Sequence, residues 1–311
     1  MKATLIVLTG HLKHRSFKTQ IGLKNRFYMG SEQMQFKVLI SIMLASLLAS
    51  LLAGCAMDDD ASGVASEPAS VAATDANVDT TAVVADGAYS LESVIVTKQG
   101  EANSYYRDQM KIYNGNRFMF AFFNDLTNKV DAGAGYAEWS NGVLIETPIA
   151  NQDGPVEGYR FELAVAATEN GYTQSIKGMP SPEGDYDLDE VWTRLSSETS
   201  AFDGLWRLEA REINGSAAAE SDNFSQMKLI GGRHYIFFQN QSIDGQPTPS
   251  YGFGSLDISA SGLVIETGRG GSVEGYVGSE QKMVTELLDL DHLKQTFEEE
   301  GVQVTHLYIR M

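Results

Sequence analysis

The chain has 311 residues and a formal net charge of −18 at pH 7, from 41 acidic and 23 basic residues. A surface of this charge repels nucleic acid, and no basic stripe interrupts it, so we exclude nucleic-acid binding. The single cysteine excludes an internal disulfide framework and a cysteine-rich zinc site.

The first informative segment is an apolar run. Sixteen residues, 38–53, follow Lys37 and lead into small residues. This pattern predicts a secretory signal. The apolar run is shorter than a typical membrane-spanning helix. The sequence "MQFKVLIS" at Met34 is typical of a normal start, so we interpret residues 1–33 as an upstream extension without a part in the fold.

The run ends in "LLAGC", residues 51–55, which resembles the lipobox of bacterial lipoproteins. The resemblance implies cleavage before Cys55, acylation of its thiol and new amino group, and a permanent membrane anchor. Ala56, where an Asp would direct retention in the inner membrane, resembles an outer-membrane sorting signal. We therefore expect an outer-membrane lipoprotein of a bacterial cell envelope, facing the periplasm. The alternative is an uncleaved anchor with an incidental cysteine.

Removal of the leader, residues 1–54, makes the chain more acidic. The leader holds seven of the Lys/Arg residues and one Glu, so the mature part keeps 16 basic and 40 acidic residues, a formal charge of −24.

Cys55 and residues 56–86 follow, rich in Ala, Ser, Asp and Thr and free of aromatics. Such a composition cannot offset chain entropy, which predicts a disordered tether of about 30 Å as a flexible coil.

The remainder repeats itself. "DGAYSLESV" at Asp86 and "DGLWRLEAR" at Asp203 share one pattern, and "MKIYNGNRFMFAF" then matches "MKLIGGRHYIFFQ" at the same offset. The segments "GVLIETP" and "VEGY" also return as "GLVIETG" and "VEGY" in the same order. The sequence therefore predicts two homologous domains, residues 87–195 and 204–311, joined by "SSETSAFD".

Both units favour an all-β fold. Short runs of Tyr, Phe, Val and Ile alternate with polar residues and are separated by Gly, Asn and Asp, which predicts about eight strands per unit. We expect two small antiparallel up-and-down barrels. The stretch Met283–Gly301 has good helical propensity. Because its counterpart in the first unit is typical of a hairpin, we expect a hairpin here also.

Gly-x-Trp on a first strand, with an Arg near the end of the last, resembles the lipocalin signature, and the closing Trp-x-Arg of the first unit resembles short lipocalin-like domains of bacterial lipoproteins. The first unit keeps an aromatic but lacks the indole. The resemblance implies that the aromatic plugs the barrel base and the Arg packs across it, with Gly allowing close approach. A carboxylate-binding role for either Arg is the alternative. The closure residues are Gly87, Tyr89 and Arg194, and Gly204, Trp206 and Arg310.

The strand "RFMFAFF", residues 117–123, is apolar on both faces. One face must line its barrel, and the other can pack the two barrels together. An eight-stranded barrel is either filled by side chains or holds one small ligand, and units this short favour the filled form. The candidate ligand-lining residues are Met110, Phe118, Phe120, Phe122, Met227, Tyr235 and Phe237.

The remaining candidate motifs indicate no metal, phosphate or catalytic site. The histidines at 234, 292 and 306 lack metal-ligand spacing, and His234 aligns with Arg117, which predicts a solvent-facing position. Gly268–Gly278 lacks the Gly-Lys-Ser/Thr ending of a phosphate loop and is interpreted as a strand connection. The acidic residues Glu286, Asp289 and Asp291 are interpreted as a solvated edge. We expect no metal, cofactor or catalytic residue.

Three functions remain open. The leading hypothesis is a lipoprotein that holds a small apolar or amphipathic ligand in one or both barrels. The alternative is an envelope protein-interaction module with filled barrels, whose partner the sequence does not name. An enzyme is the weakest candidate; its carboxylates would be Glu146 and Glu266, or Glu157 and Glu274, which recur in both units.

Overall fold

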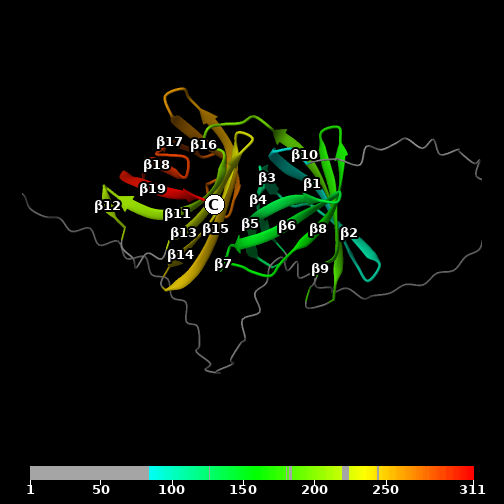
Figure 1. Ribbon diagram of the computed structural model, residues 1–311. Coiled ribbons are helices and arrows are strands. Elements are labelled where there is room, and N and C mark those ends of the chain that lie inside the picture. Colours follow the sequence, from blue (N-terminus) through cyan, green and yellow to red (C-terminus); the bar gives the residue numbers. More distant parts are fainter. Residues whose placement is uncertain (1–83, 126, 180, 182–183, 219–223, 244) are drawn as a thin grey trace, which may run out of the picture. The chain divides into compact units, whose positions relative to one another are not determined.

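The computed structural model describes residues 84–311, except 126, 180, 182–183, 219–223 and 244. These residues form two closed antiparallel barrels of eight strands each, one cyan to green and the other yellow-green to red in Figure 1. The all-β prediction is confirmed. Within the described residues, we find no helix with the length and apolarity to cross a membrane.

The first barrel closes by antiparallel pairing of its first and last strands, with Ala88 opposite Ser196 and Lys98 opposite Tyr186. The hairpin strand β2 (Glu101–Tyr105) extends β1, and β7 (Gly154–Pro155) pairs with β6. The barrel strands are β1 (Gly87–Lys98), β3 (Gln109–Asn114), β4 (Arg117–Asn124), β5 (Lys129–Ser140), β6 (Val143–Asn151), β8 (Phe161–Thr168), β9 (Gly171–Met179) and β10 (Tyr186–Ser196).

The second barrel repeats this topology. Its first and last strands pair with Trp206 opposite Arg310, and the short β12 (Ser216–Ala217) pairs with β11. The barrel strands are β11 (Gly204–Ile213), β13 (Ser225–Gly231), β14 (His234–Ile243), β15 (Gln246–Ile258), β16 (Leu263–Gly271), β17 (Glu280–Leu287), β18 (His292–Glu299) and β19 (Val302–Arg310).

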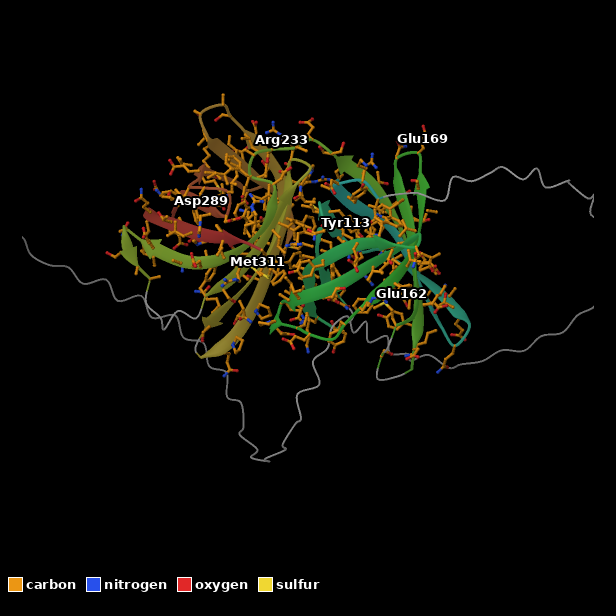
Figure 2. The ribbon with its side chains drawn as sticks, in the orientation of Figure 1. Tyr113, Glu162, Glu169, Arg233, Asp289 and Met311 are labelled. Atoms are coloured by element: carbon orange, nitrogen blue, oxygen red, sulfur yellow. The ribbon has the colours of Figure 1, made fainter. Side chains whose placement is uncertain are left out.

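The stretch with helical propensity forms a hairpin, as predicted from the repeat. Strands β17 and β18 pair with Met283 opposite Phe297. The turn is fixed by Asp289, whose Oδ1 accepts a 2.8 Å hydrogen bond from the amide of Asp291. Asp289, labelled in Figure 2, also pairs with His292 at 2.9 Å. Tertiary pairing has therefore overridden local propensity.

The glycine-rich stretch is only partly a connection. Gly268–Gly271 form the end of β16, and the turn begins at Ser272. A Cβ on Gly270 would lie 2.1 Å from Cζ of the Phe253 ring, so only glycine admits that ring. The prediction of a connection is wrong for these residues because their role is to make room for aromatic side chains.

A third apolar cluster joins the barrels, which belong to one compact unit of the chain. Strand β4 turns Phe118, Phe120 and Phe122 into the first barrel and Met119 and Ala121 toward this cluster. Strand β14 contributes to it as well, so the predicted packing of two-faced strands against each other is confirmed. The second barrel supplies Leu205, Met227, Leu229, Ile236, Phe238, Tyr251 and Phe253.

Candidate functional site

The interior of the first barrel holds a buried ion pair. The Lys111 Nζ lies 2.6 Å from Oε1 of Glu146, and both side chains are only 3% exposed. The Tyr113 hydroxyl, labelled in Figure 2, donates to the same oxygen at 2.5 Å. Lys111 also donates to Oε1 of Gln174 at 3.4 Å. These partners compensate the desolvation of both charges.

The network continues to a second carboxylate. Gln174 Nε2 donates to Oε2 of Glu190 at 2.5 Å, and Trp192 Nε1 donates to the same atom at 3.0 Å. Burial raises the pKa of Glu190, although Lys111 favours its charged form. Burial likewise raises the pKa of Asp131 to about 6.

The second barrel carries the same arrangement at the matching positions. Lys228 contacts Glu266, and its Nζ donates to Oε1 of Gln295 at 3.1 Å. Gln295 Nε2 in turn donates to the Thr285 hydroxyl at 3.4 Å. A lysine, a glutamate and a glutamine thus recur on corresponding strands of both barrels.

The two networks differ at Tyr113, which corresponds to Ile230 in the second barrel, and at two positions of the last strand. His306 of β19 takes the position that Glu190 holds on β10, and Tyr308 replaces Trp192. The His306 Nδ1 lies 3.0 Å from the Tyr308 hydroxyl, which donates to Gln226. Burial lowers the pKa of His306 to about 3, so the imidazole is neutral at pH 7.

Side chains fill the first barrel. The cavity beside Arg107, Lys111 and Glu190 has a volume of about 20 Å³, and another beside Phe118 and Glu146 has about 10 Å³. A cavity of this size holds one water molecule. The polar networks therefore serve the barrel as a structural core and leave no space there for a larger ligand.

The closure residues lie together at the ends of the barrels. The Arg194 guanidinium is 5.6 Å from the Tyr89 ring centroid, and its Nε donates to the Tyr89 hydroxyl at 3.3 Å. Gly87 begins β1 beside Ser196.

In the second barrel the Arg310 guanidinium lies 4.1 Å from the Trp206 ring centroid. Its Nη1 donates to the Asp203 carbonyl at 2.8 Å and its Nε to the Leu290 carbonyl at 2.7 Å. A Cβ on Gly204 would lie 2.2 Å from Nη1, so glycine is required for this approach. Backbone carbonyls therefore occupy two of its five donors and hold the guanidinium across the barrel end.

The candidate ligand-lining residues divide between two places. Phe118, Phe120 and Phe122 belong to the core of the first barrel, and Tyr235 and Phe237 to that of the second. Met110 and Met227 do not line either interior, contrary to the prediction, but lie in the cluster between the barrels. Strand alternation is the reason, because the neighbouring lysines take the inward positions.

The three histidines of the described residues have separate structural roles. His234 is 8% exposed, and its Nδ1 lies 2.6 Å from the Gly232 carbonyl oxygen, so the predicted solvent-facing position is wrong. The repeat misled here because Arg117 keeps its guanidinium at the surface, where Nε donates to the Met311 carbonyl. His292 is an exposed partner of Asp289. Within the described residues, no three potential metal ligands gather at one point.

A larger cavity lies in a groove where the barrels meet. Its volume is about 310 Å³, and its walls are mainly apolar. The inter-barrel groove is defined by Ile149–Pro155 of the first barrel and by Arg207, Leu208, Ser225, Gln226, Met227, Phe238, Asn240 and Met311.

Polar groups surround the apolar walls of the inter-barrel groove. Asn240 Nδ2 donates to the Gln152 carbonyl at 3.4 Å, which joins the two barrels at its edge. Arg207 is exposed and forms no ion pair among the described residues. Asn151 is 3% exposed, and its Nδ2 has no hydrogen-bond partner in the described part of the chain. Apolar walls with a few convergent polar groups are typical of small-molecule sites.

Sequence reasoning missed both the buried lysines and the inter-barrel groove. The lysines carried a signal, since a Met-Lys pair lies in the matching strand of each unit. The groove carried none, because its walls come from strands of different units. Cys55, the leader and tether residues 56–83 lie outside the described residues. The predicted disorder is wrong for residues 84–86, because Val84 packs against the core of the first barrel and the Ala85 carbonyl accepts a 2.6 Å hydrogen bond from the Tyr89 hydroxyl.

Comparisons with known proteins add little. No family model matches the chain, and no curated protein matches it. One solved structure that it matches is a protein of unknown function from the DUF3598 family of Nostoc punctiforme. The two are 12% identical, with 72% of this chain and 96% of that chain covered, and the TM-score is 0.22. This likeness carries no argument about function.

Proposed function

We propose that the chain is a lipid-anchored envelope protein that binds a small apolar or amphipathic ligand in the inter-barrel groove. The observation that carries the proposal is that the groove combines a ligand-sized volume with mainly apolar walls, whereas side chains fill the first barrel. The groove offers about 310 Å³, whereas the cavities inside the first barrel offer about 20 and 10 Å³. Ligand pockets begin at roughly 300 Å³. The barrels are the rigid frame, and the ligand lies between them.

The anchor rests on the sequence. The lipobox-like "LLAGC" and the polar tether support a protein held near the outer membrane by acylated Cys55. A membrane is the main source of apolar and amphipathic molecules in an envelope, so a tethered protein meets such ligands at high local concentration. The lipocalin-like closure motifs agree with a role in binding rather than catalysis.

A blocking substitution tests the groove. Ser225 is exposed at its edge, and Ser225→Trp would fill the groove without changing either core. A neutral fluorescent apolar probe titrated into the purified protein should bind at least tenfold more weakly to this variant. Ser216→Trp, on the exposed strand β12 and away from the groove, is the matched control and should bind as the original chain does. Equal binding by all three would place the probe elsewhere and overturn the proposal.

The alternative of a protein-interaction module is favoured by one surface feature. Leu263 of β16 and Val284 of β17 are cross-strand partners and are 39% and 48% exposed. Photo-crosslinking from position 284 in intact cells, compared with position 216, tests it. A specific protein adduct from position 284 alone would favour the alternative.

A further inference from the structure

The charged and polar edge of the inter-barrel groove determines which ligand it can hold. Two charged side chains line the groove, those of Arg207 and Asp153. Asp153 accepts a 3.1 Å hydrogen bond from the Gln152 amide, whereas Arg207 forms no ion pair among the described residues. An arginine that faces an apolar groove without a carboxylate partner is available for an anionic ligand group.

Asn151 provides a second and independent observation. Its Oδ1 accepts hydrogen bonds from the amides of Asp153 at 2.9 Å and Gly154 at 3.1 Å. These two bonds fix the orientation of the side-chain amide, so the atom left over is the donor Nδ2. That donor is buried and has no hydrogen-bond partner among the described residues, and Asn151 lies in the wall that separates the groove from the small cavity beside Phe118 and Glu146. A buried donor without an acceptor is unfavourable unless a ligand or a water molecule satisfies it.

The charge of the whole chain makes this local chemistry informative. A protein with a formal charge of −18 repels anions over most of its surface. An anionic ligand can be held only where a cation is left unpaired and further donors are present. Arg207 and Asn151 meet both conditions at one apolar groove.

We propose that the inter-barrel groove binds a single-chain amphiphile with a carboxylate head group, whose charge is matched by Arg207 and whose oxygens accept from Arg207 and Asn151 Nδ2. The alkyl chain lies against Met227, Phe238 and the apolar residues of β6. This inference rests on the proposed function, since it names the ligand class for the same groove. The carboxylate head group distinguishes this ligand from a purely apolar one, so the two ligand classes should differ in their affinity for the groove.

Decanoate and 1-decanol are the probes that test the inference, because they share a chain and differ in charge. We expect the unsubstituted protein to bind decanoate more tightly than 1-decanol at pH 7, measured by displacement of the neutral fluorescent probe. Arg207→Gln should weaken decanoate binding about tenfold and leave 1-decanol unchanged. Arg207→Lys should restore part of the loss, because it keeps the charge but not the planar fork.

Asn151→Asp tests the role of the Nδ2 donor independently of the role of Oδ1 in the turn. The aspartate keeps an oxygen for the amides of Asp153 and Gly154, and it exchanges the free donor for a negative charge. It should weaken decanoate binding by tenfold or more and leave 1-decanol binding unchanged, while burial of the new carboxylate should lower the unfolding temperature. Equal affinity for the two probes, unaffected by both substitutions, would overturn the carboxylate assignment and leave the proposed function standing. Failure of both probes, together with no effect of Ser225→Trp, would overturn the proposed function itself.

Discussion

At the scale of single residues, the most informative feature is a buried lysine inside each barrel, which the sequence alone does not predict. Lysine is almost never fully buried without a partner. Lys111 and Lys228 are nevertheless 2% and 4% exposed, each paired with a glutamate inside its barrel. Because Tyr113 and Gln174 also contact the first pair, it is satisfied rather than poised for chemistry. A general acid or base would need a free approach, and the adjoining cavity holds only one water molecule.

Removing one partner of the first pair should therefore cost much more than removing both. Lys111→Met leaves Glu146 buried without a counter-charge, and we expect a loss of about 3–5 kcal/mol in the free energy of unfolding. Lys111→Met combined with Glu146→Leu should recover most of it, since no uncompensated charge remains. Urea unfolding measures both variants.

The control for this comparison is Lys129→Met, which removes an exposed lysine of β5 and should change stability by less than about 0.5 kcal/mol. If Lys111→Met were as mild as Lys129→Met, the ion pair would be hydrated rather than buried.

At the scale of elements, the repeat predicted more than local propensity could. The hairpin of β17 and β18 was predictable only because the first unit has a hairpin at the equivalent place. The two-faced pattern of β4 predicted both the lining of a barrel and the contact between barrels. The inward position of Lys111 was not predictable in this way, because alternation leaves open whether Met110 or its neighbour faces the core. Hydrophobicity favoured the methionine, and the buried glutamate of β6 reverses that choice.

Close approach of side chains to glycine is the second element-scale property, and it gives a prediction. The Phe253 ring lies against Gly270 of β16, where there is no room for a Cβ. Gly270→Ala should therefore destabilise the protein by about 1–3 kcal/mol through overpacking. Adding Phe253→Leu should make the alanine less costly, since the shorter side chain withdraws from the site. Thermal unfolding of the two single variants and the double variant measures the coupling. Additive effects would contradict the contact.

At the scale of the whole molecule, equivalent faces of the two units pack together. Ala88, Ala121 and Ala134 of the first barrel correspond to Leu205, Phe238 and Tyr251 of the second, and all six lie in the shared cluster. At these three positions the first barrel is small and the second is large. Two copies of the large face would overcrowd each other, and two copies of the small face would leave cavities, so the size difference favours pairing of unlike barrels.

This division of size gives the last prediction. Ala121→Phe gives the first barrel the residue that the second has at the same position, so the cluster becomes overfilled. We expect a loss of about 1–3 kcal/mol in the free energy of unfolding. We also expect faster proteolysis of the junction between β10 and β11, because the barrels no longer hold each other in place. Ala217→Phe, on the exposed strand β12, is the control and should behave as the unsubstituted chain does.

The inter-barrel groove shares Met227 and Phe238 with this cluster, so Ala121→Phe should also weaken binding of the neutral probe. Unchanged stability and unchanged binding would show that the barrels do not depend on a close-packed contact.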